Sequence, residues 1–309
     1  MVELSEIVEV ERRRVFGYLK KERGEKYSRL IRGLSLAAIP LTFQTHGNII
    51  EARRRARLLT NFYVLMRSVD DVVDGDLPRP EGVASLADYV RQRIGVVKGN
   101  PPSDNADYLY YYCQSLAGKL GFTIDKETIS IYESLLFDAQ RRDWASVHEE
   151  LRFYTEHELS EYFHLRDIQG TISGMLKVFG DDPRKAKSLE YAGMADRVKL
   201  TLLDLPQDIA AGLVNIPSEE IVAYKITEND LQDAALLETR LLNGEAFMQL
   251  PDTIAHWALN QAKFGRNALD FQDEMLKGSS FRTIGKLLLK YLYMRPSRKY
   301  FDEVIAQTP

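Results

Sequence analysis

Residues 49–74 read IIEARRRARLLTNFYVLMRSVDDVVD, and this stretch decides the fold class. Apolar residues recur in it every three to four positions, a spacing that places them on one face of an α-helix. No glycine or proline interrupts the pattern before Gly75. The stretch therefore predicts one long helix that must bury its apolar face against other helices.

The same spacing continues along nearly the whole chain, and strict alternation over six or more residues is absent. We therefore predict an all-α fold, a single domain over residues 1–309 with a bundle of about ten helices around a central apolar cavity. Glycine and proline clusters separate the expected helices, which lie at about 3–22, 26–36, 49–74, 84–98, 104–119, 126–147, 156–179, 184–211, 228–242, 250–276 and 281–305.

Composition excludes several classes of protein. Of the 309 residues, 45% are hydrophobic and 28% are charged, as in ordinary globular domains. The single cysteine, Cys113, excludes a disulfide framework and a multi-cysteine metal site. Because 41 Lys and Arg face 45 Asp and Glu, giving a net charge of -4, we expect no nucleic acid partner.

We expect a cytoplasmic protein. No apolar stretch reaches the roughly 20 residues of a transmembrane helix, and the N-terminus lacks the basic and apolar regions of a signal peptide. The basic run at residues 53–57, RRRAR, is expected to be solvated. Peripheral contact of this run with an anionic membrane surface is the alternative.

Two predicted helices end in aspartates four residues apart: Asp70 and Asp74, with Asp71 between them, and Asp204 and Asp208. Carboxylates at this spacing share a face and repel each other, and the helix dipole also disfavours negative charge at this end. A solvated acidic face is the alternative interpretation for either pair alone. Two such pairs favour a hard cation such as Mg²⁺, which takes a few carboxylates together with substrate phosphates.

Tyr63 and Arg67 extend the first acidic face backwards along its helix. Stepping back from Asp70 by three and seven residues reaches Arg67 and Tyr63, so one stripe carries a phenol, a guanidinium and carboxylates. Arginine suits phosphate because its planar fork can bind two oxygens at once. Together with a carboxylate-held Mg²⁺, this stripe could form a diphosphate clamp.

These residues resemble the squalene/phytoene synthase family of all-α prenyl synthases. The family's first motif, a Tyr, an Arg four residues later and an acidic DDxxD, looks like residues 63–74. Its second motif, a helix ending in DxxxD with a glycine-to-proline exit, looks like residues 204–217. Between them, residues 168–173 are similar to the family's V-A-G-T-V-G segment, and the match in order and spacing runs from about 26 to 295.

The resemblance implies an isoprenoid synthase-like fold and a prenyltransferase that condenses two prenyl diphosphates head-to-head. Such an enzyme gives a phytoene- or squalene-type product and releases diphosphate, using Mg²⁺ or Mn²⁺, with NADPH only if it forms squalene. The resemblance assigns catalysis to Tyr63, Arg67, Asp70, Asp74, Asp204 and Asp208, metal binding to Asp70, Asp71, Asp74, Asp204 and Asp208, and substrate binding to Tyr27, Arg29, Asp138, His164, Ile168, Gln169, Gly170, Ile172, Arg197, Leu200 and Thr201.

Several positions depart from the family pattern. An Asn and a Gln that normally precede the second motif by four and seven residues are Leu200 and Arg197 here, while a Tyr is replaced by His164 and an Ala by Gln169. Leucine cannot ligate a metal, so we expect Arg197 to hold diphosphate oxygens instead. The departures leave two alternatives: an enzyme of this scaffold that cyclises one prenyl diphosphate or passes it to a different acceptor, and a non-catalytic assembly protein.

Glu161 and His164 form an E-x-x-H motif, with His157 on the same helical face. A di-iron bundle would need a second E-x-x-H and further glutamates, and no second motif occurs among the five histidines. We therefore expect His164 to line the cavity or to form a hydrogen bond, and not to bind a metal.

Overall fold

The computed structural model describes residues 4–18, 20–21, 47–148, 150–237, 241, 247–279 and 289–306. Helices are the only regular elements among these residues, so the predicted all-α class is confirmed. No helix in this part of the chain is long and apolar enough to cross a membrane. Tyr27, Arg29 and the predicted helix at 26–36 lie outside the described residues.

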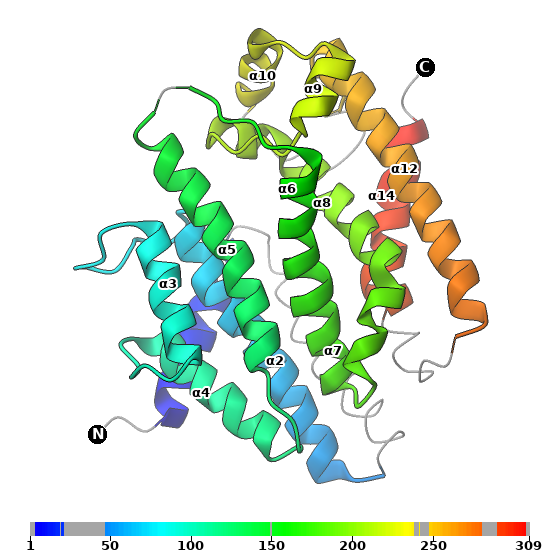
Figure 1. The fold of residues 1–309 in the computed structure, drawn as a ribbon. Coiled ribbons are helices and arrows are strands. Elements are labelled where there is room, and N and C mark those ends of the chain that lie inside the picture. Colours follow the sequence, from blue (N-terminus) through cyan, green and yellow to red (C-terminus); the bar gives the residue numbers. More distant parts are fainter. Residues whose placement is uncertain are drawn as a thin grey trace. The chain divides into compact units, whose positions relative to one another are not determined.

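A helix at residues 4–18 precedes the other elements, of which Figure 1 labels the α-helices. In chain order these are α2 (Ile49–Val73), α3 (Leu86–Val97), α4 (Asn105–Gly118), α5 (Asp125–Ala145), α6 (Glu156–Phe163), η1 (His164–Ile172), α7 (Ser173–Val178), η2 (Pro183–Leu189), α8 (Glu190–Ala210), α9 (Ser218–Tyr224), α10 (Glu228–Ala235), α12 (Asp252–Lys277), η3 (Leu289–Met294) and α14 (Arg295–Ala306).

The chain groups into two compact units. The first contains Met1–Ala139 and Gln169–Pro183, and the second contains Gln140–Ile168 and Arg184–Pro309. The chain therefore passes from one unit to the other within α5, within η1 and after Pro183. This grouping does not decide whether the units fold independently, so the single domain over 1–309 stays a prediction.

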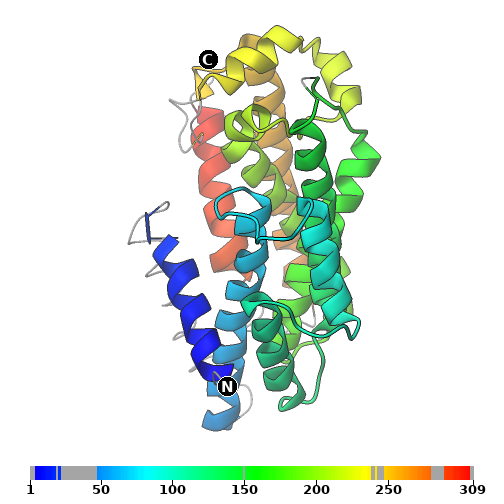
Figure 2. The ribbon, with the colours of Figure 1, turned by 90° about the vertical axis from the view of Figure 1, so that its left-hand side faces the viewer.

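The first unit is organised around α2. Asn48 caps this helix, because its side-chain oxygen accepts hydrogen bonds from the backbone N–H groups of Ile50 (2.9 Å) and Glu51 (3.3 Å). The buried face of α2 packs against α3, α4 and α7. Figure 2 shows the N-terminal helix beside α2, where Val15 and Phe16 join the same apolar core.

The second unit is organised around α8 and α12, which pack against each other. Helix α12 also contacts α9, α10 and α14, and its Trp257 is almost fully buried. Helix α8 ends in a Schellman motif: the N–H of Leu213 donates to the carbonyl of Asp208 (2.8 Å) and that of Gly212 to Ile209 (2.9 Å). Gly212 takes the left-handed conformation that the motif needs, with φ 76°.

The predicted helix at 156–179 is present as three consecutive pieces, α6, η1 and α7. Its middle piece, η1, is a π-helix of 9 residues. A π-helix of this length is rare, and such segments are frequent at functional sites. His164, Ile168, Gln169, Gly170 and Ile172, all predicted substrate-binding residues, lie in it.

Gly265 of α12 lies against the ring of Phe301 of α14. A Cβ atom at position 265 would lie 2.4 Å from Cζ and 2.7 Å from Cε2 of Phe301. Because this ring is fully buried, Gly265→Ala should overpack the contact. We expect a net loss of about 1–2 kcal/mol in unfolding free energy, since the strain exceeds the helix-propensity gain of alanine.

Urea unfolding followed by circular dichroism measures this loss. Gly17→Ala is the matched control, because a Cβ atom there meets nothing within 4 Å, and it should be neutral or slightly stabilising. Equal stability of Gly265→Ala and the wild type would contradict the close contact between α12 and α14.

Candidate functional site

The first acidic motif, defined as Tyr63, Arg67, Asp70, Asp71 and Asp74, gathers around a guanidinium. Arg67 forms ion pairs with Asp70 and with Asp71. Asp70 is 4% exposed and Asp71 is 0% exposed, so these charges lie inside the first unit. The charges of Asp74 and Tyr63 also act on Arg67. The structure therefore brings together the stripe that helical spacing predicts.

In this motif, burial and opposite charges shift the pKa values of Arg67 and Asp71 in opposite directions. Burial disfavours the charged form of Arg67, but the neighbouring carboxylates outweigh it and hold the pKa of Arg67 above its ordinary value. Burial raises the pKa of Asp71 to about 6, against the lowering effect of Arg67. Asp71 is therefore poorly suited to remain fully charged in this environment.

The carboxylate oxygens of the first acidic motif suit Mg²⁺ only in part. Asp70 and Asp74 offer hard carboxylate ligands at the end of α2, and Mg²⁺ commonly takes one or two carboxylates plus phosphate oxygens. Asp71 fits this role poorly, because burial raises its pKa to about 6. Asp70 is also buried and paired with Arg67, so a metal there would compete with that ion pair. No group of three or more His, Cys, Asp or Glu that could hold a metal occurs in the described ranges, so the predicted Mg²⁺ stays a prediction.

The second acidic motif, Asp204 and Asp208, lies in the last turns of α8. Asn215 Nδ2 donates a hydrogen bond to Asp208 Oδ2 (2.8 Å), and Asn215 Oδ1 accepts one from Arg141 Nη1 (2.9 Å). An amide thus links the acidic end of α8 to a buried guanidinium of the same unit. Sequence reasoning assigned Asn215 no role, because nothing in its spacing marks it as a partner of Asp208.

Arg197 has a partner inside the second unit. Its Nε and Nη2 donate to the two carboxylate oxygens of Asp167, each over 2.8 Å, and its guanidinium lies 4.7 Å from the ring centre of Phe163. Burial lowers the pKa of Arg197, but Asp167 more than compensates and raises it. A diphosphate at Arg197, as expected from the sequence, would have to compete with this bidentate ion pair.

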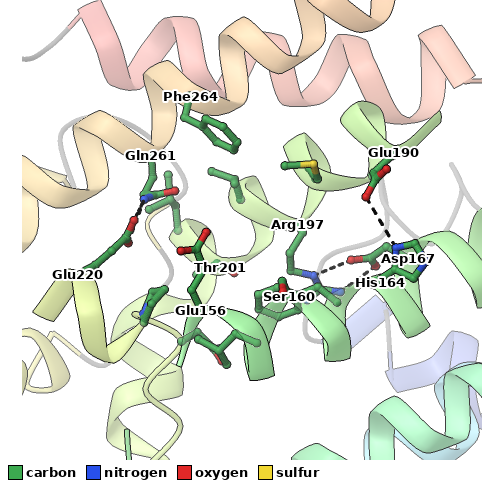
Figure 3. A pocket seen from close by; sticks show the side chains of 18 of the residues that line it. Glu156, Ser160, His164, Asp167, Glu190, Arg197, Thr201, Glu220, Gln261 and Phe264 are labelled. Atoms are coloured by element: carbon green, nitrogen blue, oxygen red, sulfur yellow. Dashed lines mark hydrogen bonds and ion pairs between the residues drawn. The ribbon is translucent and has the colours of Figure 1, made fainter. Parts of the chain in front are cut away.

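A cavity of about 250 Å³ lies within the second unit, between α6, η1, α8, α9 and α12. Figure 3 shows Arg197 with Asp167, and His164 near Glu190, on one side, and Glu220 with Gln261 on another. The walls combine apolar and acidic side chains; the lining residues are Glu156, Leu159, Ser160, Phe163, His164, Asp167, Ile168, Glu190, Gly193, Met194, Arg197, Val198, Thr201, Leu202, Asn215, Pro217, Glu220, Trp257, Gln261 and Phe264.

The cavity brings together only part of the predicted substrate-binding set. His164, Ile168, Arg197 and Thr201 line it, whereas Leu200 and the second acidic motif do not. Four further members belong to the first unit: Asp138, buried in α5, and residues Gln169, Gly170 and Ile172 of η1.

Most of the basic run at 53–57 is solvated, as expected, and Arg55 is the exception. Arg55 is buried, binds Glu51 and donates to the carbonyls of Lys177 (3.1 Å) and Val178 (2.8 Å). Arg53, Arg54 and Arg57 are exposed, as expected for a solvated face. Arg55 thus has a structural role in the first unit.

Comparisons of this chain with protein-family models, curated proteins and solved structures found no match.

The titration of Asp71 should appear in the pH dependence of stability. An aspartate in the unfolded chain titrates near 3.9, whereas Asp71 titrates at about 6 in the folded protein. The folded state then binds the proton more tightly, so this group makes the protein less stable as pH rises from about 4 to about 6. Asp71→Asn has no carboxyl group to titrate, so it should not lose this stability. The difference in unfolding free energy, variant minus wild type, should therefore increase by about 1–3 kcal/mol between pH 4 and pH 7.

Chemical unfolding at a series of pH values measures this difference. Asp233→Asn, at an exposed position of α10, is the control and should leave the pH profile unchanged. A constant difference between Asp71→Asn and wild type across this range would contradict the raised pKa.

Proposed function

We propose that the chain is a Mg²⁺-dependent prenyltransferase that transfers a prenyl group from a prenyl diphosphate. The observation that carries this proposal is the cavity of the second unit. Its apolar wall, including Leu159, Met194 and Val198, lies beside predicted substrate-binding residues such as Ile168 and Thr201. Its volume of about 250 Å³ is slightly below the roughly 300–1,000 Å³ typical of small-molecule sites.

In this proposal the hydrocarbon tail lies in the cavity, and the acidic motifs serve the diphosphate. Asp70 and Asp74 of the first unit, and Asp204 and Asp208 of the second, are each proposed ligands for Mg²⁺, which would neutralise charge on a departing diphosphate. Arg67 adds a guanidinium suited to phosphate oxygens. The apolar wall keeps water from the reactive end of the prenyl group, which would otherwise be hydrolysed.

Head-to-head condensation of two prenyl diphosphates, with an isoprenoid synthase-like fold, is the first candidate reaction. NADPH is needed only if the product is of the squalene type. Leu200 and the Arg197–Asp167 pair support the second candidate, in which one prenyl diphosphate is cyclised or passed to a different acceptor. A non-catalytic assembly protein is the third. We place the enzyme in the cytoplasm, with peripheral membrane contact as the alternative.

Incubation with C10, C15 and C20 prenyl diphosphates and Mg²⁺, with and without NADPH, followed by mass spectrometry of the products, tests the proposal. We expect prenyl transfer or cyclisation that EDTA abolishes. Asp70→Asn and Asp208→Asn should each lower turnover on the order of 100-fold or more, since each removes a proposed ligand for the leaving-group metal.

Asp233→Asn is the control, and circular dichroism checks that every variant is folded. Full turnover in EDTA would remove the metal from the mechanism. The absence of any product from all three substrates would remove the prenyltransferase.

A further inference from the structure

Polar side chains gather at two ends of the cavity, and the two ends differ in whether a cationic side chain is present. At the first end, Asp167 and the ring of Phe163 surround the positive charge of Arg197. At the second end, Glu220 lies beside Trp257 and Gln261 (Figure 3 labels Glu220 and Gln261). Each end therefore combines a carboxylate with aromatic side chains. Among the described lining residues, only those at the first end include an arginine, Arg197.

Neutral groups alone hold the carboxylate of Glu220. Trp257 Nε1 donates to Glu220 Oε2, and Gln261 Nε2 donates to Oε1 and Oε2, each over 3.0 Å. These bonds fix the carboxylate in place without cancelling its charge. In the described part of the chain, no Lys or Arg pairs with Glu220 or with Glu156, another lining residue. The second end therefore has two carboxylates that no Lys or Arg of the described residues pairs with, although each lies in the first turn of a helix, whose dipole offsets part of its charge.

The aromatic walls at this end suit a positive charge as well. Trp257 is almost fully buried and Phe264 is 47% exposed, and both line the cavity. The face of an aromatic ring attracts a cation. Phe264 is the ring for this role, because Trp257 turns its N–H edge to Glu220.

We propose that the Glu220 end of the cavity binds an organic cation carried on an apolar body. The cationic group lies at Glu220 in a charge-assisted contact, and the apolar body lies along the apolar wall of the cavity. An anionic group is disfavoured here, because Glu156 and Glu220 would repel it. Only one part of the inference rests on the proposed function, namely that this cation is the acceptor of the prenyl group; binding itself needs neither metal nor prenyl diphosphate.

Hexylammonium, hexanol and hexanoate test the proposal, because they share a chain length and differ in the charge of the head group. The chain has two tryptophans, so Trp144→Phe leaves Trp257 as the only fluorescent indole, beside Glu220. Titration of this full-length variant should show hexylammonium binding about tenfold or more tightly than hexanol, with hexanoate weakest. Equal affinity for hexylammonium and hexanol, or a preference for hexanoate, would overturn the proposal.

Charge-neutral variants locate the cation. Glu220→Gln keeps an oxygen for Trp257 but removes the charge, so it should weaken hexylammonium binding about tenfold and leave hexanol unchanged. Glu156→Gln should give a smaller loss, and it cannot disturb the fold through lost contacts, because the Glu156 carboxylate makes no hydrogen bond or ion pair with the described residues. Glu161→Gln is the matched control, being exposed on the same helix but outside the cavity lining.

Unchanged hexylammonium affinity in both Glu220→Gln and Glu156→Gln would overturn the assignment. The two proposals also fail separately. Hexylammonium binding without any prenyl turnover would refute the prenyltransferase and support the cation site. Prenyl turnover with equal affinity for hexylammonium and hexanol would support the prenyltransferase and refute the cation site.

Discussion

Negative charge at the C-terminal end of a helix is the constraint that both units have to accommodate. The helix dipole disfavours carboxylates there, and neighbouring carboxylates repel one another. In α2 the guanidinium of Arg67 pairs with Asp70 and Asp71 and so offsets this repulsion. In α8 an amide, Asn215, donates to Asp208.

The π-helix η1 supplies part of the cavity lining. A π-helix has more residues per turn than an α-helix, so it changes which side chains share a face with the preceding helix. Here η1 places His164, Asp167 and Ile168 on the cavity lining, and Asp167 engages Arg197 of α8. The ion pair between η1 and α8 therefore fixes one wall of the cavity and one of its two polar ends.

The long helices could be predicted from periodicity, because burial of an apolar face dictates their spacing. The ends of α2 and α8 followed from glycines at positions 75 and 212, which both take positive φ. The π conformation could not be predicted, since residues 156–178 keep an uninterrupted helical pattern. The contacts Asp167–Arg197 and Glu220–Trp257 also escaped prediction, because they join residues 30 and 37 positions apart and depend on how the helices pack. The sequence thus located the acidic motifs and Arg197, but not Asp167, Glu220 or Trp257 at the polar ends of the cavity.

Under the proposed function, the charges of the cavity would act differently on the two parts of a prenyl diphosphate. Arg197 is neutralised by Asp167, and Glu156 and Glu220 add negative charge, so the cavity offers a diphosphate no net attraction. Its apolar wall suits only the hydrocarbon tail. A diphosphate would therefore have to be held by groups outside the cavity, and a guanidinium or a bound metal ion is the kind of group that could hold it. The same electrostatics make the cavity receptive to a second ligand of opposite charge, so anionic and cationic partners need not compete for one position.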